Sequence, residues 1–313
     1  MDGETCRISC KKEFYDEETY MKLELLAQTR SQAGAWERDK REKTILPHFL
    51  AGIGIKTASI PPVLNGATAR GILWQAAPRR FLLDVPEVAR YLVEDGNLVT
   101  LEPVLQSDRD TVNHFFQMTP LAALLFQRGI TAFHAAAAAG PHGAVLLAGD
   151  SCAGKSTLLV EMLKRGWKML SDDLSVVALN DNGTASALPT FPDVVLWRDT
   201  LDKFNIENTG KYRQTVCMEE QFTNTPQRLK AICRLMVHNK NEIEISSTEG
   251  VDRFSALSKL LYNTRVADAL LDRTSYMQSA AAIARNVSMR TLLRPKGRWS
   301  NEELADVVEK ECR

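Results

Sequence analysis

The chain has 313 residues, of which 44% are hydrophobic and 25% charged, close to the averages of globular proteins. These proportions exclude disorder and a fibrous structure as descriptions of the whole chain. Thirty-nine basic residues balance thirty-nine acidic ones, so we expect neither nucleic acid nor an anionic membrane surface as a partner.

Cysteine usage and apolar runs indicate the compartment. Six cysteines are scattered over a chain with no apolar signal region behind its first residues, which predicts reduced thiols and a cytoplasmic protein. Cys6 and Cys10 lie four residues apart, but no Cys or His pair nearby completes a metal site. The longest apolar runs, near 135–139 and 144–148, are far shorter than the roughly 20 residues of a membrane helix. We therefore expect a soluble protein without a membrane partner.

The first third of the chain divides into two segments. Residues 1–45 are rich in charge, with apolar residues at helical spacing, and predict an exposed helical leader or a partly ordered arm. Residues 46–115 predict a small β-rich domain, because short β-rich runs at 71–74, 80–85 and 97–101 alternate with Pro, Gly and Asn turns. Inside it, Pro86 at a first helical position and Gly96 just past the end predict a short helix over 87–93.

Residues 116–313 predict a nucleotide-binding domain with a mostly helical C-terminal part. A helix begins at Pro120, capped by Thr119, and ends near Gly129. Strand 132–139, a tight turn and strand 144–148 follow, and a helix over 156–165 ends at Gly166. The remaining expected strands are 167–170, 174–179, 194–197, 230–238 and 241–246, and the remaining expected helices are 255–262, 265–271, 276–286 and 301–311.

The segment between strand 144–148 and the next helix has the spacing G-x-x-x-x-G-K-[ST] of a phosphate-binding loop. Its glycines allow backbone N–H groups to point at phosphates, its Lys meets the β/γ oxygens, and its hydroxyl binds Mg²⁺. The following helix adds the positive end of its dipole. The loop predicts ATP and Mg²⁺ as ligands, held by Gly149, Asp150, Ser151, Cys152, Ala153, Gly154, Lys155, Ser156 and Thr157.

Two further features are candidate partners of the loop. Asp172 and Asp173 follow a four-residue strand that we expect beside the loop strand in a doubly wound sheet, at the edge where such sheets bind ligands. Adjacent residues on extended chain point to opposite sides, so the two carboxylates are expected to have different tasks. His134 interrupts an alanine-rich strand; alone, such a His is more often a satisfied core residue than a catalyst.

Taken together, Phe133-His134, a short hairpin, the run GDSCAGKST, Arg165-Gly166-Trp167 and Ser171-Asp172-Asp173 resemble the catalytic domain of HPr kinase/phosphorylase and related serine kinases. The resemblance covers roughly residues 120–270. It implies an α/β fold, with a P-loop nucleotide-binding core of the HPr-kinase/PEP-carboxykinase-like type and a smaller β-rich N-terminal domain. The segment 185–201, with Pro189, Pro192 and Leu196-Trp197, looks like a motif of HPr-kinase-like proteins in peptide-modification clusters, which include kinases of lasso-peptide precursors.

The resemblance also implies roles for individual residues. Lys155 would hold the β/γ phosphates, and Ser156 would bind Mg²⁺. Asp173 matches the residue that accepts the proton of the substrate hydroxyl, and Asp172 would support it on the metal or on His134. His134 would orient or neutralise the transferred phosphoryl group. HPr kinases form hexamers, but the N-terminal region of this chain does not match theirs. The resemblance therefore leaves open whether this protein forms a homo-oligomer.

Two departures from the family pattern affect the interpretation. Thr157 replaces a Glu that follows the loop Ser, and no E-I-R-G-L-G-type segment occurs near 194–199. Reversal by phosphorolysis is therefore not expected. Cys152 stands where glycine is usual. Among nearby basic residues, Lys211 and Arg213 are candidates for a phosphate or substrate contact, whereas we interpret Arg228 and Lys230 as part of a solvated face.

The leading hypothesis is an ATP-dependent kinase that phosphorylates a Ser or other hydroxyl on a peptide or small protein, with a lasso-type precursor peptide as one candidate. Two alternatives remain. One is a nucleotide-binding regulatory or scaffold protein without transfer activity, and the other is a small-molecule kinase or a relative working in the phosphoenolpyruvate carboxykinase direction.

Overall fold

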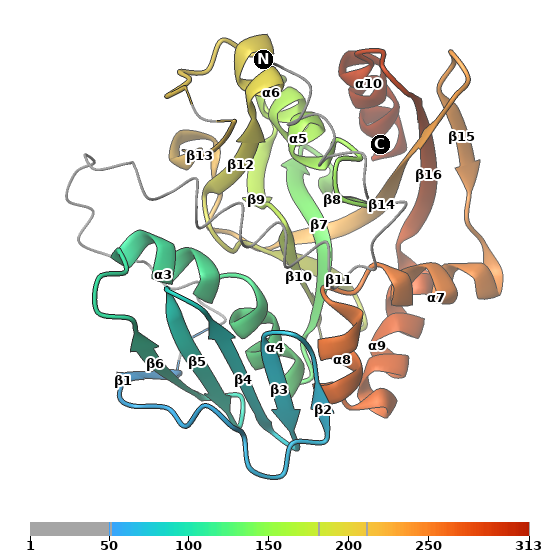
Figure 1. Ribbon diagram of the computed structural model, residues 1–313. Coiled ribbons are helices and arrows are strands. Elements are labelled where there is room, and N and C mark those ends of the chain that lie inside the picture. Colours follow the sequence, from blue (N-terminus) through green and yellow to red (C-terminus); the bar gives the residue numbers. More distant parts are fainter. Residues whose placement is uncertain (1–49, 51, 181, 211, 313) are drawn as a thin grey trace. The chain divides into compact units, whose positions relative to one another are not determined.

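The computed structural model describes residues 50, 52–180, 182–210 and 212–312 (Figure 1). The described residues up to Leu124 belong to one compact unit and those from Leu125 onward to a second. The division falls inside helix α4 (Thr119–Gln127). The leader predicted for residues 1–45 lies outside the described residues, as do Cys6, Cys10 and Lys211.

The first unit contains a six-stranded sheet in the order β1-β6-β5-β4-β3-β2. Neighbouring strands are antiparallel except for β1 and β6, which are parallel. Tyr91, wholly buried in this unit, donates its hydroxyl hydrogen bond to the Val112 carbonyl of helix α3 at 2.8 Å. The strands are β1 (Gly54–Thr57), β2 (Ala69–Arg70), β3 (Trp74–Ala77), β4 (Arg80–Val85), β5 (Ala89–Glu94) and β6 (Leu98–Pro103), and α3 is Arg109–Phe116.

The helix predicted over 87–93 is wrong, because this segment is strand β5. Ala89, Tyr91 and Val93 are buried and alternate with less buried residues, which is the two-residue period of a strand. Pro86 and Glu87 form the turn from β4, with φ of 64° at Glu87. Proline and glycine that suit helix ends therefore delimit a hairpin strand here.

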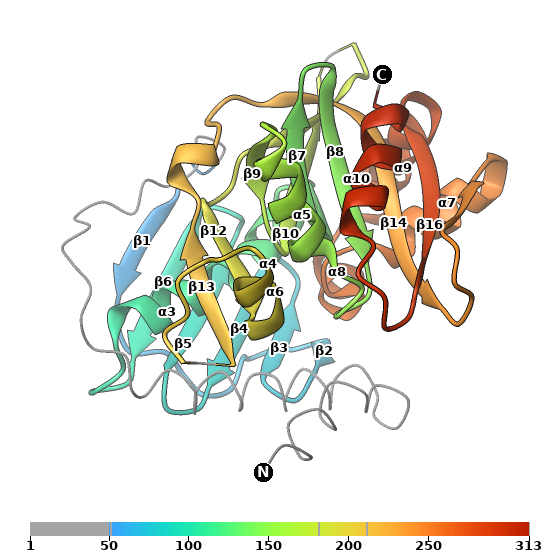
Figure 2. The same ribbon diagram turned by 90° about the horizontal axis from the view of Figure 1, so that it is seen from above.

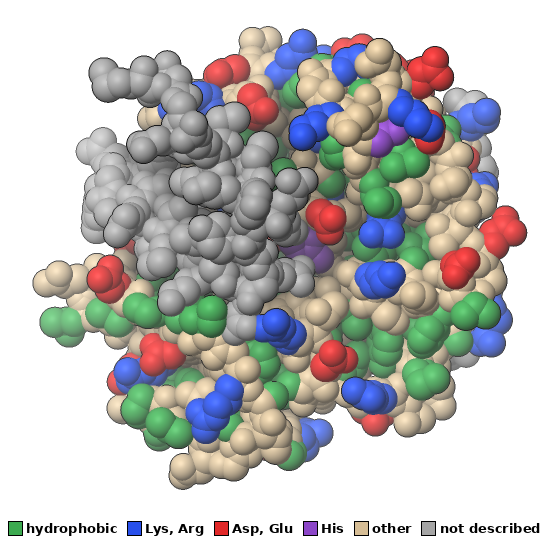
Figure 3. All heavy atoms as spheres, turned by 45° about the vertical axis from the view of Figure 1, so that its right-hand side comes forward, with side chains coloured by type: hydrophobic (Ala, Val, Ile, Leu, Met, Phe, Trp, Pro, Cys, Tyr) green, Lys and Arg blue, Asp and Glu red, His purple; other side chains and the backbone are tan. Residues whose placement is uncertain are grey.

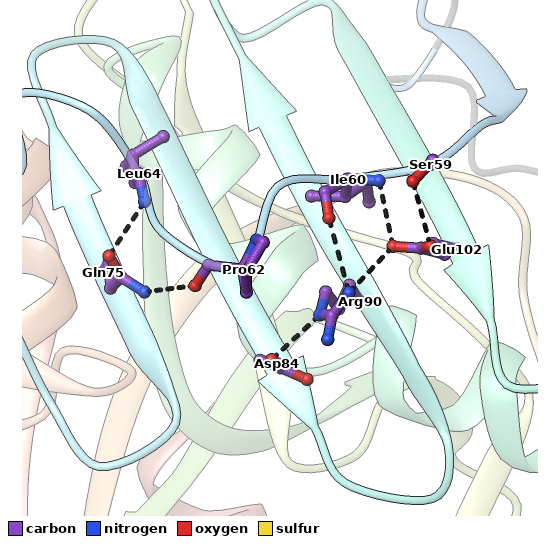
Figure 4. A network of polar contacts seen from close by, with 8 residues as sticks. All are labelled: Ser59, Ile60, Pro62, Leu64, Gln75, Asp84, Arg90 and Glu102. Atoms are coloured by element: carbon purple, nitrogen blue, oxygen red, sulfur yellow. Dashed lines mark hydrogen bonds and ion pairs between the residues drawn. The ribbon is translucent and has the colours of Figure 1, made fainter.

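Sheet side chains hold the segment 59–64 across the first unit (Figure 4). The Glu102 carboxylate accepts the backbone N–H of Ile60 at 2.9 Å, and Arg90 donates to the same carboxylate at 3.2 Å. The Gln75 side chain contacts two backbone groups of the segment. These contacts satisfy polar groups of a connection that has no strand partner of its own.

The second unit contains a mixed sheet in the order β11-β10-β7-β8-β14-β16-β15, with β9 also pairing with β7. β7 and β8 form an antiparallel hairpin, whereas β8, β14 and β16 are parallel neighbours. β12 and β13 form a separate two-stranded ribbon. The strands are β7 (Thr131–Gly140), β8 (Gly143–Gly149), β9 (Lys168–Ser171), β10 (Leu174–Leu179), β11 (Ala185–Leu188), β12 (Asp193–Trp197), β13 (Arg213–Cys217), β14 (Gln227–His238), β15 (Glu244–Ser247) and β16 (Ser288–Pro295).

Helices cover both faces of this sheet. Leu147 and Cys233 belong to one apolar cluster with residues of α5 (Lys155–Lys164) and α10 (Asn301–Glu311). Ile232, whose side chain points the other way from β14, lies against Leu257 and Ile283. The helices that carry these two residues are α7 (Gly250–Lys259) and α9 (Arg273–Asn286), and the shorter helices are α6 (Arg198–Lys203) and α8 (Thr264–Leu270). The mixed α/β class expected from the sequence is confirmed.

Arg165 joins α10 to the helix that follows the glycine-rich loop, and the two helices lie side by side in Figure 2. Its guanidinium forms ion pairs with Glu161 at 3.2 Å and with Asp306 at 2.6 Å, and it also donates to the Glu302 carbonyl at 2.8 Å. Arg165 thus has a structural task at the end of α5, where it holds α10.

The expectation of a mostly helical C-terminal part is wrong in one respect. Residues 288–295 form strand β16, which pairs in parallel with β14 along eight positions. Polar residues such as Arg290 and Arg294 interrupt the apolar pattern of this strand, which hides it in the sequence. In the part of the chain that the structure describes, no helix is long and apolar enough to cross a membrane.

Candidate functional site

The glycine-rich loop connects the end of β8 directly to the start of α5. A side chain at Gly149 would meet the Leu235 carbonyl of β14 at 2.5 Å, so the close approach of these strands requires glycine there. Gly154, with φ of 98°, turns the chain into the helix. The first N–H groups of α5 have no acceptor within the helix and lie at its positive end. This arrangement suits an anion at the loop.

Lys155 is held within the loop and is only 7% exposed. Its ammonium group donates hydrogen bonds to the carbonyls of Gly149 at 2.9 Å and Asp150 at 3.2 Å. A buried ammonium group needs such partners, because transfer from water into the protein is costly without them. The charge of Lys155 is therefore held within the loop by the loop's own carbonyls.

Ser156 and Asp172 meet at the start of α5. The Ser156 hydroxyl lies 3.0 Å from both carboxylate oxygens of Asp172, which also accepts the Val195 N–H of β12 at 3.3 Å. Burial, followed by the charge of Asp173, raises the pKa of Asp172 to about 6, against the lowering effects of these hydrogen bonds and Lys155. From the resemblance we expected Ser156 at Mg²⁺ and Asp172 on the metal or on His134; the structure brings Ser156 and Asp172 together.

Asp173 and His134 form the second contact of the site. The Asp173 carboxylate lies 3.6 Å from His134 Nε2, and both side chains remain partly exposed. The His134 ring stacks on Tyr262, with ring centroids 6.0 Å apart and planes 20° apart. Tyr262 was expected in a helix over 255–262, but α7 ends at Lys259 and the next residues bridge to β7. Sequence reasoning missed this aromatic contact.

The backbone at Asp173 is strained. Its φ is 64°, and the Leu174 N–H donates to the Asp172 carbonyl at 2.7 Å, so the three residues form a γ-turn of the rare type with positive φ. Such a conformation costs roughly 1–3 kcal/mol for a residue other than glycine. The turn separates β9 from β10, and the two carboxylates that it carries have different partners, Ser156 for Asp172 and His134 for Asp173.

The predicted position of the acidic pair needs one correction. The strand before Asp172 was expected beside the loop strand β8, but β7 lies between them, and both β9 and β10 pair with β7. The sheet is consequently mixed rather than doubly wound and parallel at this point. Because β7 carries His134 opposite Leu174, the intervening strand brings His134 beside Asp173.

Arg294, at the end of β16, was not expected at the site. Its guanidinium donates to the carbonyls of Ala153 at 2.7 Å and Cys152 at 3.2 Å. Burial lowers the pKa of Arg294. Cys152 has φ of 63°, which explains why glycine suits this loop position better. No local sequence signal indicated Arg294, because parallel pairing of β16 with β14 brings it to the loop.

The remaining residues singled out from the sequence are spread around the site. The Thr157 hydroxyl lies 3.1 Å from the Thr200 hydroxyl of α6. Arg213 stands over the Trp197 ring at 5.5 Å, on the ribbon that also supplies the Val195 N–H. Arg228 and Lys230 lie at the start of β14, the opposite end from the loop.

The site has a donor set that fits Mg²⁺, because a hydroxyl and a carboxylate are oxygen ligands and nucleotide phosphates supply further oxygens. Among the residues that the structure describes, no group of three or more His, Cys, Asp or Glu side chains could hold a metal ion. On the face shown in Figure 3, basic and acidic side chains are interspersed, in line with the balanced net charge.

Comparison with known proteins gives little beyond the geometry. No family model matches the chain, and no curated protein matches it either. Among solved structures, the HPr(Ser) kinase/phosphatase from Coxiella burnetii is similar, at 11% sequence identity and a TM-score of 0.31. The match covers 57% of this chain and 92% of that chain. A likeness of this size does not establish a shared family or function.

Proposed function

We propose that this protein is an ATP- and Mg²⁺-dependent kinase that transfers the γ-phosphoryl group to a serine hydroxyl of a peptide or small protein. The contact of Ser156 with both oxygens of Asp172 carries the proposal, because it joins the glycine-rich loop to a carboxylate, and the two side chains together offer oxygen ligands for a nucleotide-bound Mg²⁺. Asp173 and His134 lie beside that contact. A substrate hydroxyl that receives the phosphoryl group must lose its proton, and Asp173 is the base proposed to take it.

The chain supplies a role for each step. Lys155 and the N-terminal N–H groups of α5 bind the phosphates, and Mg²⁺ held by Ser156 and Asp172 would neutralise their charge. The acceptor oxygen attacks the γ-phosphorus in line as Asp173 takes its proton, and the bond to the β-phosphate oxygen breaks to release ADP. His134, beside Asp173, orients the carboxylate or the transferred group. Positioning and electrostatics account for most of the rate.

Incubation with ATP, Mg²⁺ and a pool of serine-containing peptides, followed by mass spectrometry, tests the proposal. Wild-type protein should produce phosphoserine. Asp173→Asn should bind nucleotide as before and lose transfer by about 10²–10⁴-fold, the usual contribution of a general base. Asp268→Asn, an exposed carboxylate on α8, is the matched control.

Three results would contradict the proposal in different ways. Transfer retained by Asp173→Asn would remove the proton acceptor assigned here. Slow ATP hydrolysis without any phosphorylated peptide would favour a nucleotide-dependent regulator, and turnover of free serine would favour a small-molecule kinase. Lasso-type precursor peptides belong in the pool as the narrowest candidate class of acceptor.

A further inference from the structure

Two serines bracket the strained turn that presents the acidic pair. Ser171 ends β9 and Ser175 lies in β10, and both are wholly buried. The Ser175 hydroxyl lies 2.7 Å from the Ala135 carbonyl and 2.7 Å from the Ser171 hydroxyl. The three groups thus form a hydrogen-bonded chain from one end of the turn to the strand that carries His134.

The direction of this chain follows from its donors. Each hydroxyl has one hydrogen, and a carbonyl has none. The Ser175 hydroxyl donates its one hydrogen to the Ala135 carbonyl, which can only accept. The hydrogen between the two serines therefore comes from Ser171, which donates to Ser175. The chain ends at a backbone carbonyl and so cannot pass a proton to the site. Its effect is on position alone.

The competing conformation is a straight strand. Ser171 pairs with Ala137 and Leu174 pairs with His134, so no residue is inserted between β9 and β10 in the register with β7. Asp172 and Asp173 could therefore continue the ladder opposite β7. They instead form the turn with positive φ at Asp173. Contacts of the surrounding residues must stabilise the turn relative to a continuous strand, because strained backbone persists only when its surroundings determine it.

We infer that the buried Ser171–Ser175 hydroxyl chain holds the γ-turn and thereby positions Asp173 beside His134 for phosphoryl transfer. Ser171 and Ser175 are positioning residues, since neither lies at the reacting atoms. The catalytic part of the inference rests on the proposed function, whereas its structural part does not.

Crystal structures of the wild type and of Ser175→Ala test the structural part. In the variant, we expect Asp173 to adopt negative φ and its carboxylate to move beyond 4 Å from His134 Nε2, compared with 3.6 Å here. Positive φ together with an unchanged distance would overturn the inference. Ser186→Ala, a buried serine of β11 remote from the turn, should leave both unchanged.

Kinetics with MgATP and the serine-peptide pool test the catalytic part. Ser175→Ala should lower kcat about ten- to a hundredfold, the cost of a displacement of about 1 Å, and change KM for MgATP less than about twofold. An unchanged kcat would overturn the inference. A wild type without transfer would overturn the proposed function instead, and the crystallographic comparison would still decide the structural part.

The double variant distinguishes a hydrogen-bonded chain from simple packing. Ser175→Ala leaves the buried Ser171 hydroxyl without its acceptor, so adding Ser171→Ala should cause no further loss of stability or kcat. Ser171→Ala alone keeps the bond to Ala135 and should have a smaller effect than Ser175→Ala. Additive losses would overturn the chain. Ser171→Ala provides the readout if Ser175→Ala fails to fold.

Discussion

Ser156 and Asp172 join the start of α5 to the end of β9, with the serine hydroxyl 3.0 Å from each carboxylate oxygen. The two residues come from segments that follow two different strands, β8 and β9, and β7 lies between those strands. The contact therefore depends on the order of the sheet as well as on the loop.

The hydroxyl of Ser156 should matter only when Mg²⁺ is present. Ser156→Ala removes one metal ligand and should weaken nucleotide binding roughly tenfold or more in Mg²⁺, as expected for loss of a charge-assisted contact. In EDTA, the same variant should bind ADP within about twofold of wild type. Calorimetric titration in both buffers measures this difference. Equal weakening with and without Mg²⁺ would show that Ser156 supports the loop rather than the metal.

Asp172 should make the unliganded protein less stable as pH rises. Burial, and then the charge of Asp173, raise the pKa of Asp172 to about 6, so the folded protein holds this proton more tightly than the unfolded chain. Its contribution is fully present below the ordinary Asp value of about 3.9 and is lost as pH rises through about 6. Asp172→Asn removes this dependence.

Melting temperatures of Asp172→Asn and wild type, measured without nucleotide from pH 4 to pH 7.5, test this sign. The difference in Tm should shift in favour of the variant as pH rises. Comparing the two proteins cancels the contribution of carboxylates with lowered pKa values, such as Glu102, whose pKa is held down chiefly by the Ile60 N–H. A difference that stays constant with pH would show that Asp172 titrates normally.

Arg294 should stabilise the nucleotide-binding shape of the loop. Arg294→Ala removes two hydrogen bonds to the carbonyls of Cys152 and Ala153, and we expect a loss of about 1–2 kcal/mol in stability and roughly tenfold in ADP affinity. Arg294→Lys should fall between, because lysine lacks the planar fork. Arg298→Ala is the control: its exposed pair with Glu303 should contribute less than about 1 kcal/mol. Equal effects at 294 and 298 would reject the role of Arg294.

Replacing Cys152 with glycine should make the folded protein more stable, because of the backbone conformation at this position and not because of the thiol. Cys152→Gly relieves positive φ, worth about 1–2 kcal/mol, against about 0.5–1 kcal/mol of added chain entropy. The net gain should raise Tm by a few degrees at most. Cys152→Ala keeps the Cβ atom and should give no gain. A gain from Cys152→Ala would point to the thiol instead.

The sequence predicted the parts of the site that lie close together in the chain. β7, β8, α5 and β10 stand near their expected places, because apolar runs and the glycine motif delimit them. The chemistry of the loop predicted an acidic pair near Ser156, and the resemblance put Asp172 on the metal or on His134. The strand order was wrong, since single-sequence patterns show where strands run but do not show which strand lies between two others.

Sequence patterns did not predict the site residues that are brought there by the pairing of strands far apart in the chain. Arg294 and Ala153 lie 141 positions apart, and only the parallel register of β14 with β16 brings them together. Tyr262 was hidden because the helical pattern before it ends earlier than expected. The prediction of a helix over 87–93 was wrong because proline and glycine, here Pro86 and Gly96, occur at the ends of helices and of hairpin strands alike.

In the β7–β8 hairpin, one strand carries His134 and the other leads into the glycine-rich loop. The pairing of the two strands, with Ala135 opposite Ala148, fixes the position of His134 relative to the loop. Length changes in the exposed turn at 141–142 that preserve this pairing should be tolerated during divergence. A slip of one residue would turn His134 to the other face of the sheet, away from Asp173. The hairpin thus limits which insertions and deletions natural variation can sample here, although it contains only one of the residues assigned to catalysis.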